Sequence, residues 1–204
     1  MRPRKATIIL VSLIIGIVVY YSMATIAIFQ YTEGFEIYND LWTHLRWFEY
    51  NPDGALFFRI GNLIYGVMLL VFFLGFSVWF TRASELRFRT HLIQIIGVSM
   101  AASLIIGEIL ADQSLVFVIG SGMSVLFAII ILIGFTMSFY KHARFWTPSV
   151  LIFLLTIALS SFLLYMGAID APIRDFRVID LLVTFLNQLS ICIIAFNLVR
   201  MQTD

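Results

Sequence analysis

The chain has 204 residues, of which 61% are hydrophobic and only 12% are charged, and its formal net charge is +1. Soluble globular domains average about 45–50% apolar and about 25% charged residues. The composition therefore predicts a single integral membrane domain over residues 1–204, and the small net charge excludes an electrostatic nucleic-acid binder. The single cysteine, Cys192, excludes an internal disulfide and a cysteine metal cluster.

Six apolar segments are long enough to cross a membrane, because a helix needs roughly 20 apolar residues to span the hydrocarbon core. The segments are continuous, which favours helices over strands with alternating polarity. The expected fold is an all-α bundle of six transmembrane helices with an external amphipathic segment between the first two. The predicted spans are 7–30, 58–80, 92–111, 115–140, 147–167 and 179–199. The first run is too long for the apolar core of a signal peptide and is expected to be a retained span.

Basic residues in the loops predict the orientation of the bundle, because cytoplasmic loops carry an excess of Lys and Arg. On one side of the predicted spans there are nine: Arg2, Arg4, Lys5, Arg82, Arg87, Arg89, Lys141, Arg144 and Arg200. The other side carries four: Arg46, Arg59, Arg174 and Arg177. We therefore expect a multi-pass protein of the cell membrane with both termini in the cytoplasm.

One acid lies well within a predicted span. Glu108 is about one turn from the external end of the third span, and a charge inside a span is costly and marks function by default. Gln94, Gly97, Ala101 and Asp112 share its helix face. The alternative is a structural role for Glu108, as an ion pair with Arg59 or as a satisfied interior carboxyl.

Polar residues on the other spans also gather in the predicted outer half of the membrane. Together with Glu108 they predict a polar pocket that opens to the external face. Its expected lining is Arg59, Asn62, Asp112, Ser121, Tyr165, Asn187 and Gln188. Helix packing explains many of these residues equally well, because small residues allow close helix contacts and amides bond across helices.

The longest external loop contains the aromatic stretch NDLWTHLRWFEYNPDG, residues 39–54. Read as a helix from about Phe35, it places Tyr38, Leu41, Trp42, Leu45 and Phe48 on one face, and it ends before a turn at Pro52-Asp53-Gly54. Trp and Tyr favour the membrane interface, so an in-plane helix on the outer leaflet is expected. The segment is either a lid over the pocket or a plain anchor. Its candidate lid or interface residues are Asp40, Trp42, His44 and Trp47.

Familiar catalytic and cofactor motifs are missing from the sequence. There is no GxSxG, HExxH, GxxxxGK[ST] or GxGxxG pattern. The three histidines, His44, His91 and His142, fall on different sides of the predicted topology, so neither a metal nor a cofactor is expected. Asp40 and His44 have the spacing of a pair on one helix, for which a surface contact is a more common role than catalysis.

A resemblance to a known family begins at EYNPDGALFFRIGNLIYGVMLLVFFLGF, residues 49–76. This passage resembles a prokaryotic six-helix membrane family catalogued as domain of unknown function 998, which is distantly similar to the Frag/DRAM/Sfk membrane proteins. The resemblance is carried by Asn51, Pro52, Gly54, Phe57, Asn62 and Gly66, and by IIGEILAD and IGSGMSVLFAI further on. It implies a role with lipids but no particular reaction.

Three functions are consistent with these features. The first is binding or remodelling of a membrane lipid or a lipid-linked substrate from the external leaflet, with Glu108 as the most plausible acid or base if the protein is an enzyme. The second is a non-catalytic membrane subunit or scaffold, with a membrane-protein partner or a second copy of the chain. The third, for which the sequence offers less, is transport of a small solute.

Overall fold

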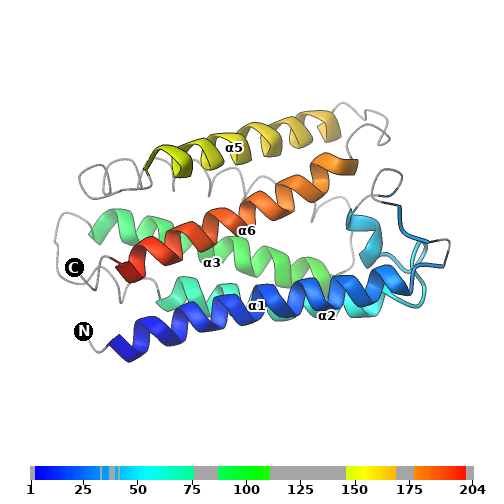
Figure 1. Cartoon of the computed structure of the whole chain (residues 1–204), viewed down its shortest axis with the longest axis horizontal. Helices are drawn as coiled ribbons and strands as arrows, with labels where there is room; N and C mark the ends of the chain where they lie inside the picture. The colour runs from blue at the N-terminus through cyan, green and yellow to red at the C-terminus, as the bar shows by residue number, and fades with distance from the viewer. Residues whose placement is uncertain are drawn as a thin grey trace.

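The computed structural model describes residues 3–32, 34–36, 40, 42–75, 87–110, 146–168 and 177–200. Over these ranges the chain is helical and contains no strand. The described residues form five α-helices and one short 3-10 helix (Figure 1). They are α1 Pro3–Phe29, η1 Trp42–Arg46, α2 Ala55–Gly75, α3 Arg87–Leu110, α5 Trp146–Ala168 and α6 Arg177–Arg200.

The five α-helices coincide with five of the six predicted spans, and the predicted span 115–140 lies outside the described residues. Two stretches are long and apolar enough to cross a membrane, Thr7–Phe29 in α1 and Ala55–Gly75 in α2. Shorter apolar stretches occur in α3, over Gln94–Ile109, and in α6, over Val178–Ile193. At 1.5 Å per residue, the 21 residues of α2 extend about 31 Å, close to the thickness of a hydrocarbon core.

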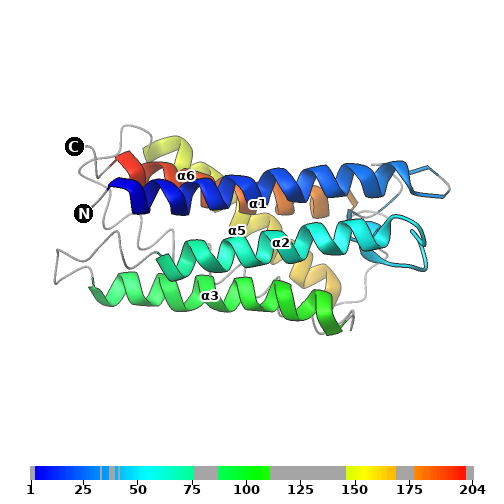
Figure 2. The same cartoon turned by 90° about the horizontal axis from the view of Figure 1, so that it is seen from below.

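The helices run along one long axis of the molecule (Figures 1 and 2). Seen from below, α2 lies between α1 and α3, with α5 and α6 behind them (Figure 2). The first turn of α1 and the last turn of α6 lie at the same end of the bundle, and η1 lies at the opposite end, here called the η1 end (Figure 1).

Glycines set how closely α2 approaches its neighbours. A Cβ added to Gly61 would lie 2.8 Å from Cβ of Met23 on α1, and one added to Gly66 would lie 2.9 Å from Cγ1 of Ile105 on α3. These positions therefore accept only hydrogen unless the helices separate. Small residues that bring two backbones close together are typical of helix contacts in membranes.

A buried asparagine joins the end of α1, η1 and the start of α2. Nδ2 of Asn51 donates to the carbonyl oxygens of Ala27, at 3.1 Å, and Leu45, at 3.2 Å, while Oδ1 accepts the N–H of Gly54 at 3.0 Å. A side chain at Gly54 would collide with the Ala27 carbonyl and with Asn51 itself. This turn explains why α2 begins at Ala55, three residues before the predicted span.

The loop before α2 is less helical than the sequence predicts. In place of a helix from Phe35, the described residues form the 3-10 helix η1, and Asp40 closes a separate tight turn by accepting the N–H of Glu36 at 2.9 Å. Of the predicted apolar face, Tyr38 and Leu41 lie outside the described residues. Trp42 and Leu45 are buried, but Phe48 is exposed because the chain turns again after η1.

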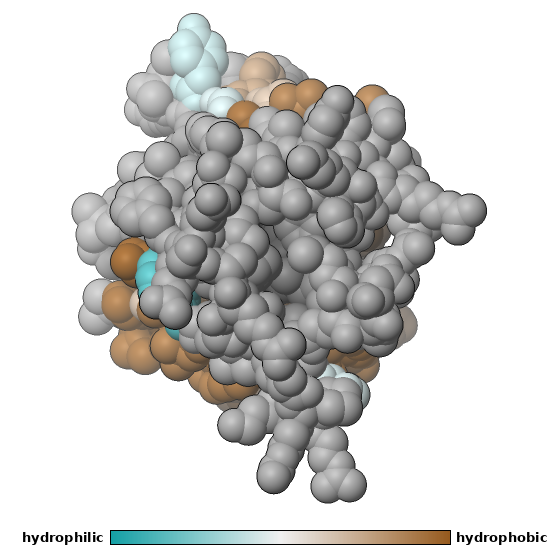
Figure 3. Space-filling view, turned by 90° about the vertical axis from the view of Figure 1, so that its left-hand side faces the viewer, coloured by the Kyte–Doolittle hydropathy of each residue, from teal (hydrophilic) through white to brown (hydrophobic). Residues whose placement is uncertain are grey.

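Large apolar side chains cover the outward faces of the helices. Along α1 alone, Ile8, Val11, Ile14, Ile15, Val18 and Phe29 are all exposed. Hydrophobic residues are also visible on the flanks in a view from the end that carries the start of α1 (Figure 3). Soluble monomers rarely expose continuous apolar surface along a whole helix, so this surface is suited to an apolar environment.

Candidate functional site

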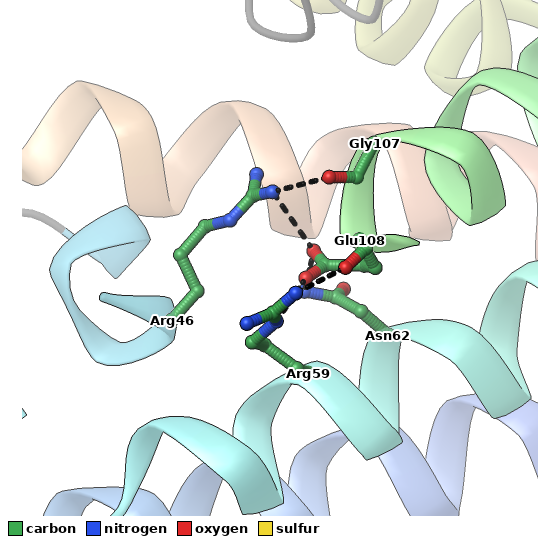
Figure 4. Close-up of polar contacts among 5 residues, drawn as sticks. All are labelled: Arg46, Arg59, Asn62, Gly107 and Glu108. Atoms are coloured by element: carbon green, nitrogen blue, oxygen red, sulfur yellow. Dashed lines mark hydrogen bonds and ion pairs between the residues drawn. The ribbon is translucent and has the colours of Figure 1, made fainter. Parts of the chain in front are cut away.

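Glu108 is the centre of a polar cluster near the η1 end (Figure 4). It lies on the last turn of α3 and is only 3% exposed. Oε1 accepts a hydrogen bond from Nδ2 of Asn62 at 3.0 Å and lies 3.5 Å from Nη2 of Arg46. Oε2 lies 3.6 Å from Nε of Arg59. Two cations therefore flank one carboxylate, and the cluster has a net positive charge.

The two arginines reach Glu108 from different elements. Arg59 lies on the second turn of α2, donates to the Glu108 carbonyl oxygen and places its guanidinium 5.6 Å from the ring centre of Phe48. Arg46 is the last residue of η1, and its Nη2 also donates to the carbonyl oxygen of Gly107 at 3.1 Å. Arg46 thus fastens the loop to the end of α3, where carbonyl oxygens have no partner within the helix.

Beside this cluster lies a cavity of about 180 Å³, here called the Glu108 cavity. It lies between η1 and four helices, α1, α2, α3 and α6. Its lining is formed by Tyr20, Trp42, Arg46, Phe58, Asn62, Tyr65, Met100, Leu104, Glu108, Thr184, Asn187, Gln188 and Ile191. Arg46, Asn62 and Glu108 are near the η1 end, whereas Met100 and Ile191 lie deeper in the bundle.

An aromatic wall places η1 against the helices. Nε1 of Trp42 donates to the hydroxyl oxygen of Tyr20 at 2.6 Å, and both side chains are buried. The Tyr20 ring also lies 5.7 Å from the rings of Phe58 and Tyr65, measured between centroids. Aromatic groups with one paired polar atom combine apolar contact area with a fixed orientation, which is common in ligand sites.

Helix α6 contributes two amide side chains and a hydroxyl group to the wall of the cavity. Thr184, Asn187 and Gln188 line it, and Gln188 is only 5% exposed. Asp180 is buried one turn before Thr184, on the same helix. Asp180, Thr184, Asn187 and Gln188 stand at positions i, i+4, i+7 and i+8, which share one helix face.

Only some of the predicted pocket residues line the Glu108 cavity. Asn62, Glu108, Asn187 and Gln188 line the Glu108 cavity. Arg59 contacts Glu108 but is not part of the lining, and Tyr165 is 62% exposed on α5. Asp112 and Ser121 lie outside the described residues.

The exposed position of Tyr165 has a simple geometric reason. Ser160 is buried towards α6, but the five residues from Ser160 to Tyr165 rotate the helix by about 140°. Tyr165 therefore shares its face with Ser161, four residues earlier, and both are exposed. The face of α5 that packs on α6 is instead marked by Thr156, whose hydroxyl lies 3.3 Å from that of Ser190.

The predicted lid or interface residues also differ in their surroundings. Trp42 lines the cavity. Asp40 accepts hydrogen bonds from the Tyr31 hydroxyl, at 3.3 Å, and from the Glu36 N–H. His44 stacks on Tyr50 with the ring centroids 4.3 Å apart, and Trp47 lies beside both rings. The hypothesis of a catalytic Asp40–His44 pair gains nothing from these contacts.

Arg46 and Tyr20 are two polar lining residues that sequence reasoning missed. Arg46 entered the prediction only as one of four external basic residues, although it is the arginine that lines the cavity. A signal was available, because a buried acid requires a cation and Arg46 lies within the aromatic stretch. Tyr20 is one of several polar residues in an apolar span, and nothing in the sequence distinguishes it from the adjacent Tyr21.

Within the described ranges, no group of three His, Cys, Asp or Glu side chains is placed to hold a metal ion. Comparisons of the chain with family models, with curated proteins and with solved structures found no match. The resemblance to the domain of unknown function 998 family therefore stays a prediction. The function must be argued from the geometry of the Glu108 cavity alone.

Proposed function

We propose that the protein is an integral membrane protein with six helical spans, and that it binds the polar head of a lipid or a lipid-linked molecule in the Glu108 cavity. In this proposal the η1 end faces the outside of the cell, both termini are cytoplasmic, and η1 covers the bound headgroup. The observation that carries the proposal is the cavity itself, which is polar near one end of the bundle and apolar further in.

Three features support a membrane setting. Two helices are long and apolar enough to cross a bilayer, and exposed apolar residues continue along their outward faces. The charged side chains Arg46, Arg59 and Glu108 contact one another near one end of the bundle. Charges in membrane helices commonly pair and face the bundle interior in this way.

The size and polarity of the cavity support a headgroup as the ligand. Its volume of about 180 Å³ is smaller than the roughly 300–1,000 Å³ of pockets that enclose whole drug-sized ligands. A headgroup fits such a volume, and acyl chains would remain in the bilayer. Arg46 offers a planar guanidinium, whose donors match the oxygens of phosphate or carboxylate groups.

The contacts of Glu108 favour binding over catalysis as its first role. Arg46, Arg59 and Asn62 engage the carboxylate, and its main-chain carbonyl is bonded to Arg59 as well. A general acid or base must exchange a proton with substrate, whereas this carboxylate has fixed partners. We therefore assign Glu108 to the orientation of the arginines and of the ligand, without assigning a reaction.

Filling the cavity tests the proposal directly. Thr184→Trp places a large ring in the cavity, and Leu182→Trp introduces the same ring on the outward face of α6, where Leu182 is exposed. Lipids that remain with the purified protein would be identified and counted by native mass spectrometry. We expect Leu182→Trp to retain the lipid of the unaltered protein and Thr184→Trp to lose it, with both variants melting cooperatively in detergent.

The outcome also separates this function from the alternative of a scaffold subunit. If Thr184→Trp and Leu182→Trp retain the same lipids in the same amount, the cavity is not the lipid site. Purification with a stoichiometric protein partner in place of a bound lipid would then favour the scaffold. A smaller change, Arg46→Gln, provides a second test, because it removes the cavity's cation without filling its volume.

A further inference from the structure

Two buried oxygens in the Glu108 cavity lack hydrogen bonds. In the part of the chain that the structure describes, neither Oε1 of Gln188 nor Oε2 of Glu108 has a hydrogen-bond partner. Both residues are at least nine-tenths buried and both line the cavity. A buried polar group without a partner costs about 1–3 kcal/mol, so native proteins rarely contain one without a reason. Both atoms are acceptors, so the missing partner must supply donors.

The charges around Glu108 restrict the kind of donor. Arg46 and Arg59 lie 3.5 and 3.6 Å from its two oxygens. An ammonium group that approached Oε2 would meet two guanidinium groups at close range, and like charges in a site of low dielectric repel strongly. A hydroxyl group donates a hydrogen bond without adding positive charge. Asp180, a buried acid on α6, is not among the lining residues.

The rest of the lining is also suited to a polyol. A hydroxyl group both donates and accepts, so it can bond to the free oxygens and also receive donors from Arg46 or the amide of Asn187. Tyr20, Trp42 and Phe58 provide apolar walls for a carbon skeleton. The small volume admits a few carbons that carry hydroxyl groups.

We infer that the Glu108 cavity recognises a hydroxyl-bearing headgroup, such as glycerol or a sugar attached to a lipid, through Oε1 of Gln188 and Oε2 of Glu108, which accept no hydrogen bond within the described residues, and that it discriminates against ammonium headgroups. This inference rests on the proposed lipid-binding function and narrows its ligand class.

The test compares lipids with identical short acyl chains. Phosphatidylglycerol carries hydroxyl groups, phosphatidylethanol has the same charge without them, and phosphatidylethanolamine carries an ammonium group. Binding to the full chain in detergent would be measured by native mass spectrometry and by the fluorescence of Trp42 and the other tryptophans. We expect phosphatidylglycerol to bind about tenfold more tightly than each of the other two, as one to two hydrogen bonds would produce.

The possible outcomes distinguish the two proposals. Equal binding of phosphatidylglycerol and phosphatidylethanol would overturn hydroxyl recognition and leave lipid binding in place. Failure of all three lipids to bind would overturn both. Free sn-glycerol 3-phosphate serves as a fourth probe, and if it binds as tightly as the lipid, polyol recognition stands but the ligand is soluble.

A pair of variants tests whether Gln188 produces the preference for phosphatidylglycerol over phosphatidylethanol. Gln188→Leu removes one of the two free acceptors, and Gln94→Leu makes the same change on α3, where the amide donates to the Leu74 carbonyl at 3.0 Å far from the cavity. We expect Gln188→Leu to reduce the preference for phosphatidylglycerol over phosphatidylethanol several-fold while phosphatidylethanol still binds. An unchanged preference in Gln188→Leu would overturn the assignment. Retained phosphatidylethanol binding shows that the variant is folded.

Discussion

At the scale of single residues, polar side chains act where the chain changes direction or where helices meet. Asn51 is fully buried and has three hydrogen bonds to three different segments. Glu108 is buried and contacts η1 and α2. Each would be costly in isolation, and each is stabilised by partners distant in sequence. The same burial makes both residues informative targets for substitution.

Asn51→Ala should be strongly destabilising. It removes all three side-chain hydrogen bonds and leaves the Ala27 and Leu45 carbonyls without their donor in a buried turn. We expect a loss of about 2–4 kcal/mol, measured as a lower melting temperature in detergent. Asp53→Ala, at an exposed position of the same turn, is the matched control and should melt like the unaltered protein. Equal melting of both variants would show that the Asn51 bonds contribute little.

At the scale of elements, the helices are held by close contacts between α2 and its neighbours. Gly61 and Gly16 place α2 against α1, and Gly66 places it against α3. Buried aromatic residues such as Phe72 then fill the remaining space. Packing of this kind is sensitive to added volume, because interiors are close-packed and overpacking forces side chains or whole helices to move.

Gly61→Leu tests the close contact between α2 and α1. Leucine favours a helix over glycine by about 1 kcal/mol, which acts in favour of the variant. Its Cβ would lie 2.8 Å from Cβ of Met23, so α1 and α2 must separate, and we expect a net loss of about 1–3 kcal/mol. Val67→Leu, on an exposed face of α2, should leave the melting temperature unchanged. A variant at Gly61 that melts as high as the Val67 control would refute the close contact.

The sequence is a good guide to the helices and a poor guide to the loop that approaches the cavity. Long apolar runs predict α1 and α2 because every backbone polar group is satisfied within a helix, whatever its neighbours. The loop that contains η1 depends instead on contacts between segments, such as the bond from Trp42 to Tyr20 and the bond from Asn51 to the Ala27 carbonyl. Arg46 and Gly107 are 61 residues apart, so no local pattern joins them. Tyr165 shows the same limit, because the rotation of α5 depends on its contact with α6.

At the scale of the whole molecule, charge and polarity are unevenly distributed along the bundle. The cluster around Glu108 lies near the η1 end, and the exposed apolar surface extends along the helices towards the opposite end. The start of α1 and the end of α6 both lie at that opposite end (Figure 1). With nine Lys and Arg predicted on the side of the chain ends and four on the other, the proposed orientation follows from the positive-inside rule.

Cysteine labelling in intact cells tests that orientation. The chain has one cysteine, Cys192, so Cys192→Ser provides a background without thiols. Asp53→Cys adds a thiol at an exposed position of the η1 end, and Lys5→Cys adds one near the start of α1. A membrane-impermeant maleimide should label the thiol at position 53 in intact cells and the thiol at position 5 only after permeabilisation. The reverse pattern would place the Glu108 cavity on the cytoplasmic side, and the ligand would then have to come from the inner leaflet.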